Sequence, residues 1–485
     1  MKITQIKIKN FKAFNGENIF NINSGLVFLV GENNTGKTTL LEAISFLKSL
    51  PEKKKIEDLK NKKAVEKDFV SVEIKIQGDI TNIIDDFSEE KYKKYVFKED
   101  EVETILICRS SENRKVKQEK GKEIELNEKK ITLWNNESKQ FENASGFDSV
   151  ISTLFETQFV WSDADPDDVT DFGSTKICGK LLNNVIGDFY QTDKWQAFIK
   201  SHKSTFHEGD DSLSKKSEVL ELEIQKILEN QYGAAKIKFD FNLPDAKTFS
   251  TSTSIKVNDG IETDLKDKGS GMQRAFALAV IQTYAKFLTK HDTDDTKQKP
   301  LFFFIDEPEI SLHPKAQKIL MQALDKISKN QQIFITTHSP YILREFSGAN
   351  HNMFIFSKDS GRIYYKPSDD LKLFKFSPSL GEINYFAYDL PTIEFHNELY
   401  GVLQEQEMKY SLIEIDNFFE ERGIIKNKDW IEIDKKTGTA KPSYKVASMT
   451  FIRNTIHHPE NKENSNFTDI ELRESIEKMI ALINK

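Results

Sequence analysis

The 485-residue sequence contains few cysteines, few glycines and prolines, and no long apolar run. Its two cysteines, Cys108 and Cys178, exclude a disulfide scaffold and a cysteine-rich zinc module, and they are typical of a reducing compartment. With 21 glycines and 12 prolines, the chain is neither collagenous nor of low complexity. No eighteen consecutive residues are apolar, and the alternating start predicts a strand rather than a signal peptide.

The chain also lacks an excess of positive charge. The 69 lysines and arginines are outnumbered by 77 aspartates and glutamates, which gives a net charge of −8. This balance excludes a globally basic nucleic-acid coat but leaves room for local basic grooves. A hydrophobic content of 38% is enough for buried cores, and the length suggests about three domains of roughly 150 residues. We therefore expect a soluble, cytoplasmic, multidomain protein with no membrane partner.

A phosphate-binding pattern lies near the start of the chain. The apolar run Leu26–Val30 predicts a central strand, and Leu40–Leu47 has apolar residues at helical spacing. Between them, Gly31–Thr38 fits the pattern G-x-x-x-x-G-K-[ST]. Glycines let successive backbone N–H groups surround a β-phosphate at the positive end of the helix. In this arrangement Lys37 would contact the β- and γ-phosphates, and the Thr38 hydroxyl would bind Mg²⁺.

Two acidic residues follow a second apolar strand far downstream. Phe302–Ile305 is fully apolar, and Asp306 and Glu307 come directly after it, where α/β sheets bind their ligands. Asp306 can hold Mg²⁺ opposite Thr38, and Glu307 can orient and deprotonate an attacking water. His338 follows the next apolar strand and could hydrogen-bond the γ-phosphate or that water. The less specific interpretation is that the acids cap a helix and the histidine is structural.

Gly269–Arg274, at the start of a predicted helix, is a third candidate element. Ser270, the backbone of Gly271 and the helix dipole together suit an anion. A second phosphate clamp makes sense if it reaches the nucleotide bound by another subunit. The alternative is a flexible hinge before the helix.

Strands and helices alternate through these motifs, which predicts a largely parallel sheet covered on both faces. Two further strands are expected at Ala235–Phe241 and Ser252–Val257. The predicted domains are residues 1–85 as an ATPase lobe with the phosphate loop, 86–155 as a mixed insertion, 156–370 as the rest of the ATPase, and 371–485 as a helical C-terminal domain.

The phosphate loop, Gly269–Arg274, Phe302–Glu307 and Thr337–Pro340 occur in an order that resembles the ABC-type ATPases. The chain looks most like the SMC and overcoming-lysogenization-defect (OLD) branch, which includes the ATPase subunits of the Septu, PARIS and retron antiphage systems. The resemblance covers about residues 1–80 and 155–370. It implies an α/β P-loop ATPase with a mostly parallel sheet, a mixed insertion and an α-helical C-terminal appendage.

The resemblance also implies roles for individual residues. Lys37 and Thr38 would bind phosphate and Mg²⁺, Asp306 would bind Mg²⁺, and Glu307 would be the catalytic base. His338 would be the switch histidine. The implied nucleotide-binding residues are Gly31, Asn33, Asn34, Thr35, Gly36, Lys37, Thr38 and Thr39, together with Lys12, which stands where relatives often have arginine.

A signature of Ser270, Gly271 and Gln273 would act across a dimer. The Q-loop glutamine has no clear counterpart. We expect its place near Gln158–Asp163, with Gln77 as a weaker candidate. A Toprim nuclease, with which OLD-type proteins end, needs an acidic cluster that residues 374–485 do not clearly contain.

The C-terminal region contains a short second motif. Arg453, Asn454 and His458 resemble the R-x(4–6)-H motif of metal-independent HEPN-type ribonucleases. In those enzymes the histidine assists proton transfer at the ribose 2′-hydroxyl and the arginine stabilises the phosphorane charge. Alternatively, Arg453 and His458 cap helix ends or form salt bridges at a dimer interface.

These patterns favour an ATPase that dimerises around ATP and Mg²⁺ and gates an antiviral effector. A separate nuclease subunit of the HNH or Toprim type is the expected partner, with nucleic acid as a further ligand. Three alternatives remain. One is an ATP-gated ribonuclease with its own site at Arg453 and His458, another is an SMC-like DNA-repair ATPase, and the third is a nucleotide-gated scaffold with negligible turnover.

Overall fold

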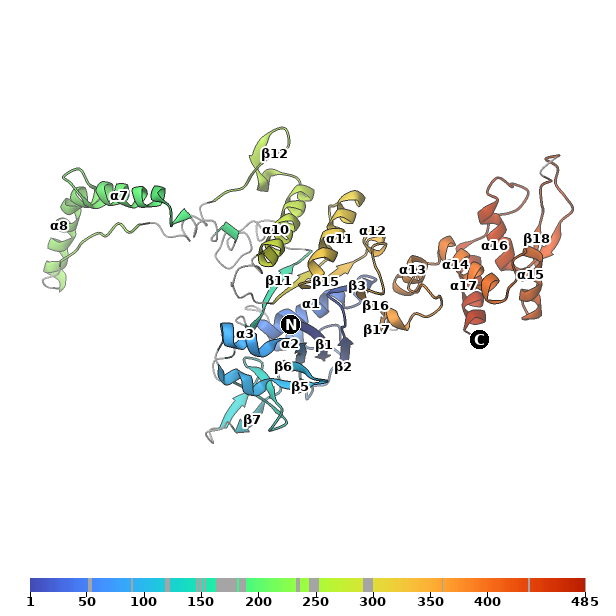
Figure 1. The fold of residues 1–485 in the computed structure, drawn as a ribbon, viewed down its shortest axis with the longest axis horizontal. Helices are drawn as coiled ribbons and strands as arrows, with labels where there is room; N and C mark the ends of the chain where they lie inside the picture. Colours follow the sequence, from blue (N-terminus) through green and yellow to red (C-terminus); the bar gives the residue numbers. More distant parts are fainter. Residues whose placement is uncertain are drawn as a thin grey trace. The chain divides into compact units, whose positions relative to one another are not determined.

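A computed structural model gives the fold (Figure 1). It describes residues 1–50, 55–88, 90–117, 123–144, 147, 151, 154–162, 181–182, 189–232, 236–243, 253–290, 300–359, 361–434 and 437–484. The chain divides into two compact units, which are considered separately below. The first unit comprises Met1–Ser162, Asp294–Glu309 and His313–Lys485, and the second comprises Asp163–Thr293 and Ile310–Leu312.

The first unit contains the predicted parallel sheet. Six described strands follow the order β11, β14, β15, β3, β16 and β17, and all neighbouring pairs are parallel except β16 with β17. Every residue of β3, β14 and β15 is buried, as expected for central strands covered on both faces. Their bounds are β3 Leu26–Gly31, β11 Glu156–Val160, β14 Leu301–Ile305, β15 Gln332–Thr337, β16 His351–Asp359 and β17 Arg362–Pro367.

A second sheet in this unit is antiparallel throughout its described strands. Its order is β10, β9, β6, β4, β1 and β2, and β5 pairs with β6. Apolar residues alternate along β1 and β4, so one face of the sheet turns to the core. The strands are β1 Lys2–Lys9, β2 Glu17–Asn21, β4 Ser71–Gln77, β5 Phe97–Glu99, β6 Val102–Ser110, β9 Ile131–Asn135 and β10 Gln140–Glu142.

This sheet differs from the predicted domain division. Ser71 of β4 pairs with Ser110 of β6, so the expected boundary between residues 85 and 86 lies inside one continuous sheet. The segment 86–155 therefore extends the first lobe with further strands. The sequence of a short strand does not indicate which strand it pairs with. For this reason the strands in residues 86–155 suggested a separate insertion. This segment also contains the 3-10 helix η1 Glu90–Tyr95 and β7 Arg114–Lys117 paired with β8 Glu123–Leu126, and helix α3 Ile80–Phe87 crosses its expected start.

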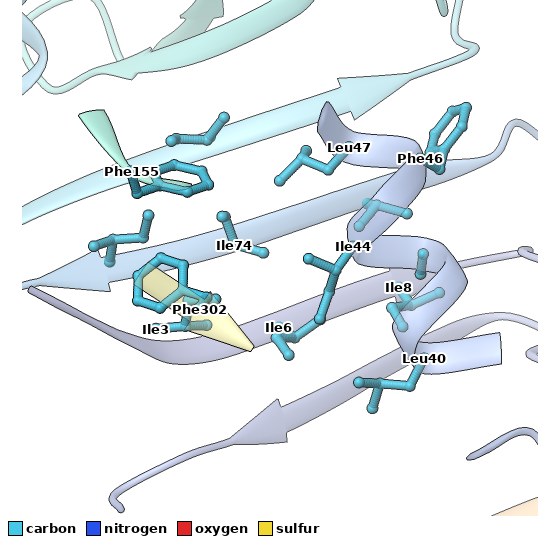
Figure 2. Packing of buried hydrophobic residues seen from close by; sticks show 14 of the residues in the cluster. Ile3, Ile6, Ile8, Leu40, Ile44, Phe46, Leu47, Ile74, Phe155 and Phe302 are labelled. Atoms are coloured by element: carbon cyan, nitrogen blue, oxygen red, sulfur yellow. The ribbon is translucent and has the colours of Figure 1, made fainter. Parts of the chain in front are cut away.

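Helix α1, Lys37–Lys48, contacts both sheets: β3 and β15 of the parallel sheet, and β4 and β6 of the antiparallel one. Figure 2 shows its side chain Ile44 on the side of the helix that faces Ile6 and Ile74, and Leu40 belongs to the same buried cluster. The same buried cluster includes Phe302 of β14. The helix that carries the phosphate loop is thus fixed by apolar burial on two sides, and full burial of each such side chain contributes about 1.5–3 kcal/mol.

The remaining helices of the first unit include the C-terminal helices expected in residues 371–485, the last of which begins with a capping box at Thr468 and Glu471. The C-terminal helices form a separate buried cluster that includes Phe395, Leu399, Met449 and Ile476. No helix among the described residues is long and apolar enough to cross a bilayer. The bounds are α2 Ile56–Leu59, α11 Pro314–Ser328, α12 Pro340–Leu343, η4 Ser368–Asp370, α13 Leu380–Tyr388, α14 Ile393–Gln406, α15 Leu412–Glu421, α16 Ser448–His457 and α17 Asp469–Ile483, with a hairpin of β18 Lys428–Trp430 and β19 Tyr444–Val446.

The second unit is largely helical in its described part. Strand β12 covers only the end of the stretch expected at 252–257, and residues 236–243 form neither helix nor strand, so the strand expected at 235–241 is wrong where it is described. The elements are α7 Asp193–His207, α8 Leu213–Tyr232, α10 Ser270–Lys290, the 3-10 helix η2 Leu265–Asp267, and β12 Lys256–Asn258 paired with β13 Glu262–Asp264.

Candidate functional site

Four neighbouring strands of the parallel sheet end at the same edge. Strands β11, β14, β15 and β3 run parallel, so the residues that follow them are brought together. Those residues are Ser162, Asp306, His338 and the phosphate loop. The carboxyl edge of a parallel sheet is where α/β proteins bind ligands. The sequence predicted three of these four contributions.

The phosphate loop uses backbone conformations that favour glycine. Gly31 has φ +150° and Gly36 has φ +97°, while Asn34 is also left-handed at φ +61°. A Cβ on Gly31 would lie 2.1 Å from the Phe356 carbonyl oxygen, so neighbouring strand β16 admits no side chain there. Helix α1 begins at Lys37 with no side-chain cap. Its first amide groups therefore suit an anionic ligand.

Other loop side chains divide into a buried and an exposed set. Thr35 is buried and its hydroxyl donates to the Glu32 carbonyl at 2.7 Å. Thr39 is buried as well, whereas Asn33 and Asn34 are exposed. The threonines thus stabilise the loop, and the asparagines lie on its solvent side.

Lys37 is folded back into its own loop. Its Nζ donates to the carbonyl oxygens of Gly31 at 2.8 Å and Glu32 at 2.7 Å, and the residue is only 4% exposed. Burial lowers the pKa of Lys37 to about 8, and the nearby carboxylates of Glu307 and Asp306 oppose that shift. A buried ammonium held by two neutral carbonyls is well placed to accept a stronger anionic partner.

Asp306 is the centre of a hydrogen-bond network at the strand ends. Its Oδ1 accepts from the Thr38 hydroxyl at 3.0 Å and from the Thr336 hydroxyl at 2.7 Å. Its Oδ2 accepts from the Ser162 hydroxyl at 2.7 Å. Asp306 is 2% exposed. The predicted juxtaposition of Asp306 with Thr38 is therefore present, and oxygen ligands of this kind are those that Mg²⁺ prefers.

Glu307 and His338 lie next to each other at this edge. Glu307 Oε1 is 3.5 Å from His338 Nε2, and the Glu307 amide donates to the Thr336 hydroxyl at 2.9 Å. Glu307 has a left-handed φ of +46°, which is unusual for a residue with a side chain and is typical of functional positions. Burial, aided by the positive charge of Lys37, lowers the pKa of His338 to about 4, so the imidazole is neutral at neutral pH.

A comparison with protein families agrees with this geometry. The family model described as AAA ATPase domain matches residues 1–343, which is about 70% of the chain. The chain belongs to the AAA ATPase domain family. It is therefore an ATPase with a nucleotide-binding α/β fold and a helical C-terminal region. The matched range ends within α12, so the C-terminal helices lie outside the family's domain.

Two curated relatives of this AAA ATPase are nucleases by name. It is 25% identical over 368 residues to the Old nuclease of Escherichia phage P2, covering 72% of this chain and 58% of the relative. It is 25% identical over 373 residues to Endonuclease GajA of Bacillus cereus strain VD045, covering 71% of this chain and 57% of that protein. The chain thus spans less than three fifths of the length of the curated relatives it matches.

Solved structures similar to this AAA ATPase include heads of SMC proteins. An SMC head bound to the C-winged helix domain of ScpA has 16% identity and a TM-score of 0.46, with coverage of 76% of this chain and 97% of that chain. An SMC head domain from Thermotoga maritima has 12% identity and a TM-score of 0.36, with coverage of 76% and 99%.

The other residues predicted to contact the nucleotide in this AAA ATPase lie in different parts of the structure. Lys12, at φ +43°, forms an ion pair with Glu42 of α1. Gln158 lies within β11 and pairs with Phe303 of β14, and Asp163 lies outside the described residues. Gln77 belongs to the antiparallel sheet, where its amide donates to Thr104 at 3.1 Å.

The predicted signature lies in the second unit at the start of α10. Ser270 is exposed, and its hydroxyl is 3.4 Å from that of Ser311. A Cβ on Gly271 would lie 2.8 Å from the Ser311 carbonyl oxygen, which favours glycine at this position. Gln273 is used locally, because its amide donates to the carbonyls of Lys266 at 2.9 Å and Lys268 at 2.8 Å.

In the C-terminal pair, Arg453 lies in the middle of α16 and His458 directly follows the helix. Arg453 donates to the amide oxygen of Asn454 at 3.3 Å, and His458 Nδ1 is 3.2 Å from Glu460 Oε1. A cavity of about 550 Å³ is lined by His458, Trp430 and Asn454, whereas Arg453 is not among the described residues that line it. The motif's two side chains therefore do not share this cavity.

Three hydrogen-bonding residues of the site were not predicted. Ser162 and Thr336 bond to Asp306, and Glu309 accepts from the loop that carries His338. Thr336 and Ser162 could have been found as hydroxyl residues at the ends of strands next to β14. Glu309 could not have been predicted from the sequence in this way, because its contacts depend on the turn that follows Asp306 and Glu307.

Proposed function

We propose that the chain binds ATP with Mg²⁺ at this edge of the parallel sheet and hydrolyses it there. The observation that carries the proposal is the joining of Thr38, which follows the phosphate-loop lysine, to Asp306 at 3.0 Å. In the bound state the Lys37 ammonium would exchange its two carbonyl partners for the β- and γ-phosphates. The backbone amides from Asn33 to Thr39 would hold the remaining phosphate oxygens.

Thr38 and Asp306 suit Mg²⁺ because both offer oxygen ligands. Within the described residues there is no group of three His, Cys, Asp or Glu side chains that could hold a metal by itself. This fits an ion that is shared with the substrate's phosphates, as is usual for Mg²⁺. When bound, Mg²⁺ would supply positive charge to the phosphate oxygens.

Glu307 is proposed as the base that orients and deprotonates the attacking water. Its neighbour His338, at 3.5 Å, is neutral at neutral pH because its pKa is lowered to about 4. A neutral imidazole can donate from one ring nitrogen and accept at the other, which suits contact with the water or the γ-phosphate. Lys12 is proposed as a further contact, since it pairs with Glu42 on the phosphate-loop helix.

The active assembly is proposed to be a homodimer or higher oligomer in which Ser270, Gly271 and Gln273 approach the nucleotide of the neighbouring subunit. The exposure of Ser270 supports this, because the residue is available to a partner. ATP binding would then gate an antiviral effector. The names of the relatives, Old nuclease and Endonuclease GajA, support a nuclease as the effector. We propose that a partner subunit of the HNH or Toprim type supplies it and acts on nucleic acid.

Two substitutions test the ATPase proposal directly. Lys37→Ala should abolish nucleotide binding, measured with a fluorescent ATP analogue, because the buried ammonium is lost. Glu307→Gln should retain binding but lower kcat on the order of a hundredfold, because the base is removed. Equal slow turnover by the wild type and Glu307→Gln would instead indicate a nucleotide-gated scaffold.

A second candidate function is an intrinsic ribonuclease in the C-terminal region. The observation that favours it is that His458 lines a cavity of about 550 Å³. Cleavage of RNA by the purified chain that is lost in both Arg453→Ala and His458→Ala, with ATP hydrolysis intact, would establish it. Since Arg453 is not among the described residues that line the cavity, we favour the ATPase with a separate effector.

A further inference from the structure

The loop from Thr337 to Ser339, which carries His338, is held from one side by a single carboxylate oxygen. Glu309 Oε1 accepts from the Thr337 hydroxyl at 2.8 Å, from the His338 amide at 2.6 Å and from the Ser339 amide at 3.1 Å. Glu309 lies three positions after Asp306, so it connects the acidic turn to the histidine loop. These three bonds fix the backbone from which the His338 side chain projects.

Burying the Glu309 carboxylate costs folding free energy, which indicates that its contact with the loop Thr337–Ser339 is functional. Burial raises its pKa, and its second oxygen, Oε2, is buried with no hydrogen-bond partner among the described residues. A buried carboxylate with one unsatisfied oxygen costs folding stability, so a task that an apolar residue could not perform would explain its presence. Orienting two successive amides is such a task, because it requires an acceptor.

Tyr388 holds the same loop from the C-terminal region. This last residue of α13 donates its hydroxyl to the Thr337 carbonyl at 3.3 Å, and its ring centroid is 6.0 Å from that of His338. Burial raises the pKa of the phenol, so it stays protonated and remains a donor. Helix α13 also contacts β3 and β16 of the parallel sheet.

We propose that Glu309 and Tyr388 are positioning residues for His338, and that Tyr388 connects the C-terminal helices to the hydrolysis step. The proposal rests on the role of His338 proposed above. Side chains that act in catalysis must be held within about 0.5 Å of the productive geometry. A loop fixed from two sides by Glu309 and Tyr388 meets that demand. A movement of α13 would release one of the two contacts and so alter turnover.

Substitution of Glu309 tests the first contact. Glu309→Ala should lower kcat on the order of ten- to hundredfold through displacement of His338, while KM for ATP changes by less than about threefold. Glu309→Gln keeps an acceptor oxygen and should restore most of the lost kcat. If Glu309 had only a structural role, Glu309→Ala would not lower kcat at a nearly constant KM, and Glu309→Gln would not restore kcat.

Glu103 provides a matched control. It accepts from the Ile80 amide, the Thr81 amide and the Thr81 hydroxyl at 2.7–2.8 Å, the same donor set that Glu309 has, but within the antiparallel-sheet lobe. Glu103→Ala should lower stability and leave kcat per folded molecule unchanged. If both alanine variants lower kcat equally, or Glu309→Ala raises KM alone, the positioning role is wrong.

Tyr388→Phe tests the second contact while keeping the ring. We expect kcat to fall several-fold at constant KM, whereas Tyr365→Phe, which removes a hydroxyl bonded to the Ile19 carbonyl at 2.8 Å, should have no effect. Because both contacts act on one loop, the effects of Glu309→Ala and Tyr388→Phe on kcat should not be additive. Additive effects would overturn the shared role. If Lys37→Ala hydrolyses ATP as fast as the wild type, the proposed site itself fails, which is a different result.

Discussion

Thr38 Oγ1 lies 3.0 Å from Asp306 Oδ1, although 268 positions separate the two residues in the chain. The contact joins the first turn of α1 to the end of β14. Both side chains offer oxygen atoms near the buried ammonium of Lys37, which is the arrangement that the proposed binding of a polyanion with its counterion requires. Substitution of this pair is therefore the most direct test of the proposed ATP hydrolysis.

Asp306→Asn should lower kcat for ATP on the order of a hundredfold, which corresponds to about 3 kcal/mol of transition-state stabilisation. The expected cause is the loss of a charged oxygen ligand at the proposed Mg²⁺ position. Titration of the ATPase rate with Mg²⁺ measures it. Asp325→Asn is the control, because Asp325 bonds to His351 at 3.0 Å beyond the opposite end of β15. An unchanged rate in Asp306→Asn would remove this residue from the site.

Gly31→Ala should destabilise the fold by about 3 kcal/mol or more, because the new Cβ would lie 2.1 Å from the Phe356 oxygen at a left-handed φ. Gly401→Ala is the opposite case. Gly401 is an exposed residue of α14 with nothing within 4 Å of the Cβ position, so alanine should stabilise the helix by up to about 1 kcal/mol. Urea unfolding of both variants measures the contrast. Equal effects would contradict the described loop conformation.

Mixing two inactive variants tests action across a dimer. Lys37→Ala lacks the proposed phosphate contact, and Ser270→Arg places a bulky side chain in the proposed signature. Each should be inactive alone, but a mixed dimer contains one site with both elements intact. Random mixing in a two-fold dimer should therefore recover about a quarter of the wild-type rate. No recovery at any mixing ratio would mean that Ser270 acts within its own chain or takes no part.

Lowering the pH should destabilise the C-terminal helices through His396. Burial lowers the pKa of this fully buried histidine to about 3, so below pH 6.5 the unfolded chain binds a proton that the folded chain does not. The free energy of unfolding should fall by about 2 kcal/mol between pH 7 and pH 5. His396→Gln should flatten that dependence, and the exposed His207→Gln should not. Parallel pH curves for the wild type and His396→Gln would disprove the assignment.

The strand ends of the site were readable from the sequence because each strand is short, apolar and followed at once by polar residues. Leu26–Val30 and Phe302–Ile305 are such runs, and both predicted strands are confirmed. Once the strands are parallel, the residues after them must meet. The helix from Lys37 was equally clear, since its apolar spacing matches the two sheets that it contacts.

Contacts that depend on the order of strands in the sheet or on the shape of a turn could not be predicted from the sequence. Ser162 reaches Asp306 only because β11 lies beside β14, and Glu309 reaches the His338 amide through a turn with unusual backbone angles. The domain division was difficult for a related reason. Strand β6 pairs with β4, and nothing in either segment identifies its neighbour.

The division of the chain into Met1–Ser162, Asp294–Glu309 and His313–Lys485 on one side, and Asp163–Thr293 with Ile310–Leu312 on the other, has a practical consequence. Every proposed phosphate and Mg²⁺ contact made within one subunit comes from the first set, in which β11 pairs with β14 and β3 pairs with β15. Covalent continuity between residues 162 and 294 is therefore not needed to assemble these ligands. A protease cut within that stretch should leave two fragments that stay associated and still retain ATP.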